Sequence, residues 1–486
     1  MILPSAGDGP NSHRLLAVLV AALLGGCSLA PVYQRPQAVV PGTLGASDAA
    51  TAPHAAAAAA TVALTEQEQR FLHDFSPNRD LAPLVSQALA HNPDFRTTVL
   101  QVQQARAQYR IDRSQQLPQI GVQAQDTRQS YDDPQRQALY GQKLVTAAVG
   151  VDSFELDLFG KLAALSAAAQ QRYLSSAYGQ QAARGALIAE VLRTYTVERA
   201  AAQAQDRFQA IAKDSAALLA FANDQHDVGL ISNDALDRQR HQTDQAQVRA
   251  LQAVSDHAAA RRALQLVAGF DAPAGSGDLQ DLLPADPGAA ALRDLDSAVL
   301  LQRPDIQQAE AELRARNADI GAARAAFFPS IKLSTSLGTA SDVLSGLFKT
   351  GSRAWSFAPE LTLPIFDFGR NRANLDIAQL RKQAGIADYE KAIESAFRDV
   401  ADALDANPGL QQREQRERAN SEREQQRIAR MDKRVAQGLQ DRTTLLGERI
   451  AAEQAALDHL QSRQDLILNR IALFRAFYGV QLPHAS

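Results

Sequence analysis

The chain has 486 residues, 45% of them hydrophobic and 21% charged, which is enough apolar material for a large ordered structure. Its 50 basic and 54 acidic residues give a net charge of −4, and this balance argues against nucleic acid as a partner. A single cysteine excludes intramolecular disulfides and the metal sites that need several thiolates.

The N-terminus has the features of a lipoprotein signal peptide. An apolar run from Leu15 to Leu24 is too short to span a membrane as a helix. The run leads through two glycines to Cys27, a pattern that resembles a bacterial lipobox. We therefore expect residues 1–26 to be removed and Cys27 to be lipidated and to carry acyl chains into the membrane. Ser28, in place of an aspartate, favours sorting to the outer membrane.

The segment after Cys27 is expected to be a tether. Residues 30–61 are rich in Pro, Gly and Ala and show little sidedness, so we assign residues 27–64 to a lipidated N-terminal tether. No later run reaches the roughly 18 apolar residues that a membrane-spanning helix needs.

The rest of the chain is internally duplicated. Five pairs of landmark residues recur with separations of 209 to 211 residues, which chance turn residues would not give. We therefore predict a first repeat at 65–270, an equatorial linker at 271–295, a second repeat at 296–480 and a C-terminal tail at 481–486. The landmark pairs are Pro93/Pro304, Pro118/Pro329, Gly160/Gly369, Gly229/Gly438 and Gly269/Gly479.

Each repeat is predicted to contain a helix, two strands, a very long helix and a return helix. Helices are indicated by a leading proline or by long stretches without a terminator, and strands by alternation of apolar and polar residues. In the first repeat the expected helices are 93–116, 162–227 and 232–267. The strands begin at Ile120 and Val145, the second with a bulge near Ser153.

The second repeat is expected to follow the same order. Its helices are predicted at 304–327, 370–437 and 443–478, with a kink at Asn407-Pro408-Gly409 because proline removes a helical hydrogen bond. Its strands are predicted at 331–338 and 355–365. The polar segments 131–140 and 339–352, which join the strands of each repeat, are expected to be loops that face the outside.

The number of strands predicts oligomerisation. Four strands cannot close a barrel, and an open sheet edge is not tolerated in hydrocarbon. Two copies would give eight strands and a filled interior, whereas three copies would give twelve strands and room for a pore. Each long helix could extend about 100 Å, and each return helix stacked on a short helix nearly matches it, which suits the wall of a uniform tube.

These features resemble outer membrane factors of the TolC type, and within them the NodT-like lipoprotein branch. The resemblance covers essentially the mature chain. It implies an α+β membrane protein: a trimeric twelve-stranded outer-membrane β-barrel with four strands per chain, continuous with a long periplasmic α-helical barrel. The motifs are the lipobox, Asn92-Pro93-Asp94 and Arg303-Pro304-Asp305, the segment 155–160 (Glu-Leu-Asp-Leu-Phe-Gly) and the segment 320–330 (Ile-Gly-Ala-Ala-Arg-Ala-Ala-Phe-Phe-Pro-Ser).

The resemblance also implies function and partners. It indicates the exit duct of a tripartite efflux system, with a periplasmic adaptor protein and an inner-membrane pump of the resistance-nodulation-division type as partners, and no cofactor. In the family the helix–turn–helix ends contact the adaptor, and two Gly-Leu turns match them, although such a turn can also merely join two helices. The matching residues are Val228, Gly229, Leu230, Gln437, Gly438 and Leu439.

The chain departs from the family at the gate. The position nine residues past the second tip glycine, which usually holds an aspartate, is Gly447, and Thr443 lies one turn earlier. Charged substitutes could form a ring in a trimer and attract cations, although charges on a long helix are more often its solvated face. The substitutes are Asp234, Asp237 and Arg238 in the first repeat and Glu448 and Arg449 in the second.

Three other functions compete with this interpretation of the sequence. Enzymes are disfavoured because the sequence has no phosphate loop, no dinucleotide-binding motif and no nucleophile elbow, and its histidines lack metal-ligand spacing. A surface-anchored coiled-coil scaffold would explain the helices and the lipobox but needs neither strands nor a duplication. The outer-membrane component of type I protein secretion remains an alternative, because the same kind of duct serves both systems.

Overall fold

The computed structural model describes residues 30–35, 63–77, 81–269, 278–282, 292–293 and 295–480. The chain divides into two compact units, Met1–Ala58 and Ala59–Ser486. The signal peptide, Cys27, most of the expected tether, most of the linker and the C-terminal tail lie outside the described residues. The following description concerns the second unit.

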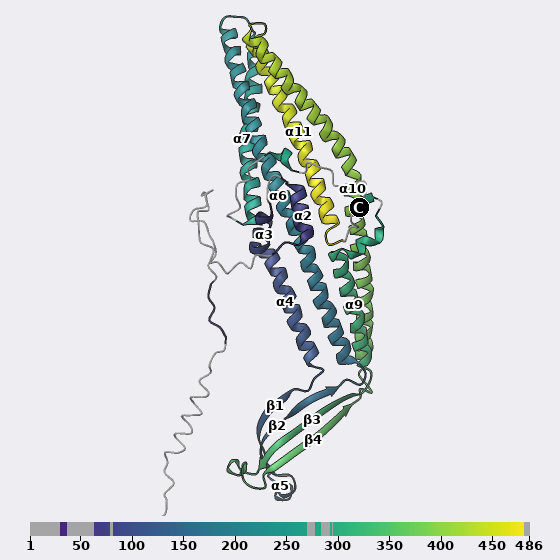
Figure 1. The fold of residues 1–486 in the computed structure, drawn as a ribbon. Helices are drawn as coiled ribbons and strands as arrows, with labels where there is room; N and C mark the ends of the chain where they lie inside the picture. The colour runs from purple at the N-terminus through teal and green to yellow at the C-terminus, as the bar shows by residue number, and fades with distance from the viewer. Residues whose placement is uncertain are drawn as a thin grey trace, which may run out of the picture. The chain divides into compact units, whose positions relative to one another are not determined.

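Two helices of 67 residues, α6 (Lys161–Asp227) and α10 (Arg370–Ala436), set the length of the helical part, about 100 Å at 1.5 Å per residue. α6 packs against all four of the shorter helices, whereas α10 packs against α9 and α11 (Figure 1). The shorter helices are α4 (Pro93–Ser114), α7 (Asn233–Ala268), α9 (Pro304–Ala325) and α11 (Arg442–Ala476). All six lie where the sequence predicts helices.

α4 and α9 each begin beside the end of a return helix: α4 beside α7, and α9 beside α11. The side-chain amide of Asn92, which caps α4, donates a hydrogen bond to the Val267 carbonyl near the end of α7, at 3.4 Å. In the second repeat Arg303, just before α9, donates to the Ala476 carbonyl at the end of α11, at 3.0 Å. The expected end-to-end stacking is therefore present in both repeats, and it lets two helices run beside one long helix.

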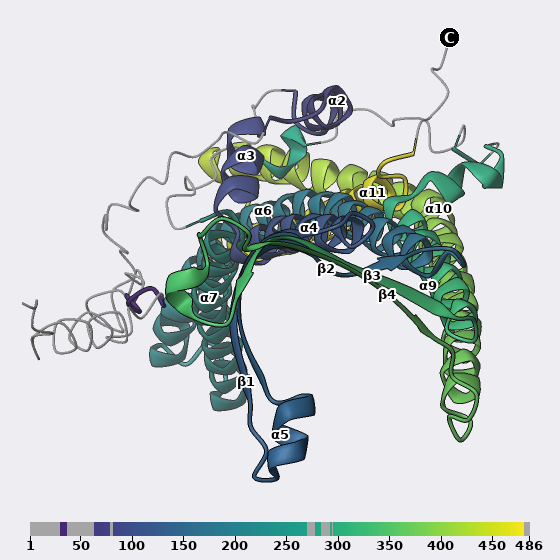
Figure 2. The ribbon, with the colours of Figure 1, turned by 90° about the horizontal axis from the view of Figure 1, so that it is seen from below.

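The four strands form one antiparallel sheet in the order β1-β2-β3-β4. β1 and β4 are its outer strands and have no partner on their far sides within the sheet of this chain. Figure 2 shows sheet and helices following one concave arc. The predicted bulge is confirmed, because the β2–β3 register shifts between Val151 and Phe154 and Ser153 has φ 55°. The strands are β1 (Ile120–Gln129), β2 (Gln142–Leu156), β3 (Ser330–Ser341) and β4 (Arg353–Thr362).

Three local expectations need correction. The segment expected as a loop at 131–140 contains a helix, α5 (Pro134–Tyr140), capped by the Asp133 carboxylate, which accepts from two backbone N–H groups. β4 ends at Thr362, three residues earlier than predicted. The segment expected as a loop at 339–352 begins with the end of β3, at Ser341, and contains the 3₁₀ helix η3 (Leu344–Gly346). Pro408 lies inside α10 without interrupting it, and α10 changes direction along its length (Figure 1), so a kink at 407–409 stays a prediction.

The main core lies at a level that we call the waist. There α2 (Glu66–Phe75), α3 (Ala82–His91) and the short 3₁₀ helix η1 (Leu279–Asp281) pack against α6, α7 and α11. The largest fully buried apolar side chains of this cluster come from five separate segments: Phe75, Val85, Ile188, Leu192, Leu279 and Ile467. The segments before the first repeat helix and between the repeats thus add bulk around the long helices at one height.

Across the described part of the chain, no helix has both the length and the apolarity that a membrane crossing requires.

Candidate functional site: the two helix–turn–helix tips

The first tip, residues 221–240, turns from α6 into α7 through a tightly hydrogen-bonded glycine turn. Gly229 has φ +76° and its N–H donates to the His226 carbonyl, while the Leu230 N–H reaches back to the Gln225 carbonyl, both at 2.8 Å. This pair of bonds is the Schellman motif, which ends a helix by satisfying its last carbonyl groups. The turn leaves Val228 and Leu230 with 70% and 74% of their surface exposed.

The second tip, residues 430–449, repeats the geometry between α10 and α11. Gly438 has φ +71° and donates to the Val435 carbonyl at 3.0 Å, and the Leu439 N–H donates to the Arg434 carbonyl at 2.9 Å. Gln437 is the last residue before this glycine, and Leu439 is 63% exposed. Each tip therefore presents an exposed leucine on a tightly hydrogen-bonded turn.

Each return helix starts with a side-chain cap. Ser232 accepts a hydrogen bond from the Ala235 N–H at the start of α7. Asp441 accepts from the Thr443 hydroxyl and from the Thr444 N–H and hydroxyl at the start of α11. These bonds, the one from Thr443 foremost, hold the pKa of Asp441 well below its usual range. The caps fix the direction in which each chain leaves its turn.

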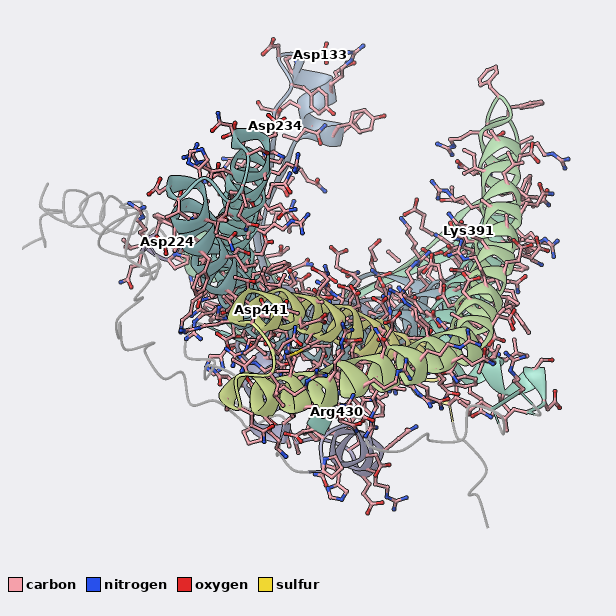
Figure 3. All side chains as sticks on the ribbon, turned by 90° about the horizontal axis from the view of Figure 1, so that it is seen from above. Asp133, Asp224, Asp234, Lys391, Arg430 and Asp441 are labelled. Carbon is pink, nitrogen blue, oxygen red and sulfur yellow. The ribbon has the colours of Figure 1, made fainter. Side chains whose placement is uncertain are left out.

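The candidate gate residues of the first repeat lie at the start of α7. Asp234, Asp237 and Arg238 are all exposed, and Figure 3 shows Asp234 on this helix. Asp237 pairs with Arg240 of the same helix at 3.2 Å. Among the described residues no hydrogen bond or ion pair joins the candidates of the first repeat to those of the second.

The candidates of the second repeat have different surroundings. Thr443 supports the α11 cap, and Gly447 is exposed with nothing within 4 Å of the position its Cβ would take. Glu448 and Arg449, proposed as substitutes for the gate, instead pair across the hairpin with residues of α10. Arg449 bonds Asp432 at 3.1 Å, and Glu448 bonds Arg427.

A further set of charges, between the waist and the tips, has no signal in the sequence. Arg207 of α6 pairs with Glu453 of α11 at 3.0 Å. Asp214, also on α6, has a raised pKa, mainly because of burial; nearby Arg449 acts in the opposite direction. These residues tie α6 to α11 although their positions are about 240 residues apart, and no local pattern marks such pairs.

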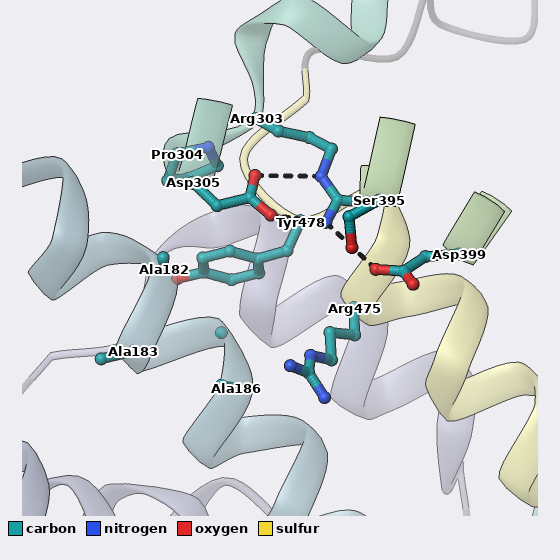
Figure 4. A pocket seen from close by; sticks show the side chains of 11 residues that line it. Ala182, Ala183, Ala186, Arg303, Pro304, Asp305, Ser395, Asp399, Arg475 and Tyr478 are labelled. Carbon is teal, nitrogen blue, oxygen red and sulfur yellow. Dashed lines mark hydrogen bonds and ion pairs between the residues drawn. The ribbon is translucent and has the colours of Figure 1, made fainter. Parts of the chain in front are cut away.

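At the waist a cavity of about 340 Å³ lies between α6, α9, α10 and the end of α11 (Figure 4). Its buried cation, Arg303, is paired with Asp305 at 2.6 Å and with Asp399 at 3.6 Å. Within the described ranges no group of three or more His, Cys, Asp or Glu residues could hold a metal ion. The charges that line the cavity thus serve to hold the ends of α9 and α11 together against α10.

The chain is similar to known proteins over most of its length. The model of the family described as outer membrane efflux protein matches residues 84–269 and 295–477, one segment in each repeat. Outer membrane protein OprJ of Pseudomonas aeruginosa is 38% identical, with 95% of each chain covered. The probable outer membrane lipoprotein SilC of Salmonella typhimurium is 34% identical over 96% of this chain and 98% of its own length.

A solved structure agrees with the fold. The open state of the MtrE outer membrane channel of Neisseria gonorrhoeae superposes with a TM-score of 0.69 at 35% identity, covering 82% of this chain and 89% of that one. The expected fold class is confirmed: the chain has the α+β fold of solved outer-membrane channels, with a four-stranded sheet joined to long helices. The expected location in the outer membrane of a Gram-negative bacterium is confirmed as well.

The duplicated helical hairpins, the open four-stranded sheet and the match along both repeats lead to one conclusion: the chain belongs to the outer membrane efflux protein family and is the outer-membrane channel of a tripartite efflux system.

Proposed function

We propose that three copies of this chain form a passive duct for small molecules that an inner-membrane pump of the resistance-nodulation-division type expels through a periplasmic adaptor. The observation that carries the proposal is the sheet with two free outer strands, β1 and β4, because such edges need partners inside a membrane. The duct supplies a path and no chemistry, so the proposal assigns no catalytic residue and no cofactor.

The test is reconstitution of the mature protein. We expect the detergent-extracted protein to be a trimer by light scattering and to conduct ions in planar bilayers. A water-soluble monomer without conductance would refute the duct and would revive a scaffold that lacks a pore.

Lipidation of Cys27 is part of the same proposal. Cells grown with labelled palmitate should incorporate the label into the parent protein and not into a Cys27→Ser variant. Equal labelling of the two proteins, or no label on the parent, would contradict the assignment. Normal channel formation by the unlabelled Cys27→Ser variant would show that insertion does not need the anchor.

The two tips are proposed to dock the adaptor through their exposed turns. The support is the paired geometry: Gly229 and Gly438 hold tight turns that expose Val228, Leu230 and Leu439 beyond the helix ends. A Gly438→Asp change adds bulk and charge at the turn, and we expect it to abolish efflux while the trimer persists. Gly438→Ala is the matched control, since it shares the cost of a positive φ without the charge.

That experiment requires an adaptor and a pump that work with the parent channel. We would choose them by restored ethidium efflux in a host lacking its own outer-membrane channel. Undiminished efflux through Gly438→Asp would count against the tips as the docking site.

Asp234 and Asp237 are proposed to constrict the resting duct, with Arg238, Thr443 and Gly447 as neighbours in the gate. In a trimer they would supply six carboxylates near the end of the tube, a suitable ring for attracting cations. The Asp234→Ala/Asp237→Ala variant should show higher conductance or altered cation selectivity in planar bilayers. Glu66→Ala/Asp74→Ala removes the same charge from α2 as a control, and identical behaviour of the gate variant and the parent would exclude the assignment.

A further inference from the structure

The duplication allows the two tips to be compared position by position. With Gly229 aligned on Gly438, residues 221–240 correspond to residues 430–449. Both segments share the positive-φ glycine, the two Schellman bonds, the exposed leucine and a side-chain cap on the return helix. Side chains that differ between the tips are therefore not required by the backbone that the tips have in common.

The two tips differ in net charge. The first tip has four aspartates and two arginines, whereas the second has five basic and three acidic residues. One position is reversed outright: Asp224 and Lys433 each lie five residues before the glycine. Figure 3 shows Asp224 and Arg430 on separate hairpins. Where the first tip is uncharged, the second tip gains three bases, Arg430, Arg434 and Arg442, and also three acids, Asp432, Asp441 and Glu448. It lacks counterparts of Asp227, Asp234, Asp237 and Arg238, so the net charge is −2 at the first tip and +2 at the second.

Asp224 and Lys433, and two further charges of the tips, have no hydrogen-bond or ion-pair partner within the described part of the chain. Among the described residues, no hydrogen bond or ion pair involves the side chains of Asp224, Asp234, Lys433 or Arg442, and all four are exposed. The pairs that bind α10 to α11 use other residues, such as Arg449 and Asp432. The reversed charges are thus available to a partner.

Lys433 in the last turn of α10 and Asp234 in the first turn of α7 agree with the local helix dipole, whereas three other charges of the tips oppose it. Asp224 and Asp227 lie in the last turn of α6, where the dipole favours cations, and Arg442 is the first residue of α11, where it favours anions. Asp227 has only the adjacent His226, at 3.8 Å. Residues that break a local rule without compensation in the chain are expected where function requires them.

We propose that the two tips recognise differently charged faces of the adaptor, the first tip a basic face and the second an acidic face. The inference rests on the proposed function of the tips. The exposed Val228, Leu230 and Leu439 supply the apolar contact, while the charges set the association rate and assign each face of the adaptor to one tip. The adaptor contacts around the ring of six tips then alternate between two kinds.

The test uses the full-length trimer and the adaptor that restores efflux with the parent channel, with binding measured at 0.1 M and 1 M NaCl. Asp224→Lys and Lys433→Asp should each weaken binding about tenfold at 0.1 M and about twofold at 1 M, because the screening length falls from about 10 Å to about 3 Å. Asp74→Lys, an exposed reversal on α2, is the control and should bind like the parent.

The swap variant Asp224→Lys/Lys433→Asp is the decisive one. It keeps the net charge of the tips, so binding weaker than either single variant supports recognition of separate faces. Binding like the parent, or unweakened binding by both single variants at 0.1 M, would overturn the proposal.

The alternative explanation for the charge difference is attraction between neighbouring tips within the trimer. In that case each single reversal would raise conductance in bilayers without adaptor and the swap would restore it, a result that would also overturn the proposal. Failure of this inference is separable from failure of the docking site, because Gly438→Asp tests docking itself. If Gly438→Asp abolishes adaptor binding and the reversals do not weaken it, only the charge assignment fails.

Discussion

The waist and the tips use charge in opposite ways, although α6 and α11 contribute to both. At the waist the Glu68 carboxylate is 1% exposed and accepts hydrogen bonds from Arg184 at 2.7 and 2.8 Å and from the Tyr478 hydroxyl at 2.8 Å. At the tips Asp224 and Lys433 are exposed and unpaired within the described chain. Buried, paired charges hold segments of the waist together, whereas the exposed charges of the tips make no such contact within the described chain and are the ones proposed to meet the adaptor.

The difference extends to packing. The waist collects large apolar side chains from α2, α3, α6, α11 and η1 in one cluster. The tips instead expose theirs on glycine turns. Segments with few buried contacts open at low cost in free energy, so we expect the waist to stay fixed while the tips rearrange when a partner binds.

The largest expected effect is the loss of Glu68. Glu68→Ala leaves the partly buried Arg184 with only the Ala63 carbonyl as an acceptor and removes the acceptor of Tyr478. The free energy of unfolding should therefore fall by about 3 kcal/mol. Thermal unfolding followed by circular dichroism in detergent measures it. Arg70→Ala, which breaks an exposed pair with Glu66 on the same helix, should cost less than about 1 kcal/mol. Equal losses in the two variants would remove the contrast between waist and surface.

Acid should weaken the same contact. Burial alone would raise the pKa of Glu68, but hydrogen bonds from Arg184, the Thr65 N–H and Tyr478 outweigh it and hold the pKa below its ordinary value of 4.5. Its contribution to stability is therefore complete above about pH 4.5 and declines as the pH falls through the lowered pKa. The difference in melting temperature between parent and Glu68→Gln should shrink from pH 7 to pH 3; a constant difference would argue against the ionised pair.

Two glycine-to-alanine changes, one at the waist and one near the second tip, should change stability in opposite directions. At the waist a Cβ on Gly185 would lie 2.4 Å from the Tyr478 ring, whose hydroxyl is held by Glu68. Gly185→Ala should therefore destabilise the protein by about 1 to 3 kcal/mol through overpacking. Stability equal to that of the parent would mean that Tyr478 moves freely and that the waist is less rigid than its contacts indicate.

The smallest effect is expected near the second tip. Gly447 is a helical residue of α11 with open space around its Cβ position. Gly447→Ala should stabilise the hairpin by about 0.5 to 1 kcal/mol, because alanine favours the helix and meets no neighbour. Slower amide exchange in α11 measures the gain, and faster exchange would show that this position contacts another subunit.

The sequence predicted the features that depend on local rules. The six long and short helices, the four strands and the bulge at Ser153 follow from periodicity and from proline and glycine positions. The two tip turns followed from Gly229 and Gly438 for the same reason, since a tight helix end with positive φ favours glycine. The helix α5 was missed although Asp133-Pro134 is a helix start, because a polar segment between strands was read as a loop.

The assignment of charged residues could not be made this way. Glu448 and Arg449 looked like candidates for the gate, but the hairpin turns them toward Arg427 and Asp432 of α10. Asp234 and Lys433 remain free, and their sequence neighbourhoods do not differ in kind from those of the paired residues. Whether the proposed gate and adaptor roles hold is decided by the experiments above.

The sequence by itself determined the duplicated order of elements, the length of the long helices and the position of the turns, because each depends on residues close together in the chain. Only the tertiary structure decided which charges are buried and paired. Glu68 and Tyr478 meet across 410 positions of sequence, and Arg207 and Glu453 across 246. Such contacts leave no periodic signal, since they depend on which faces of distant helices pack together.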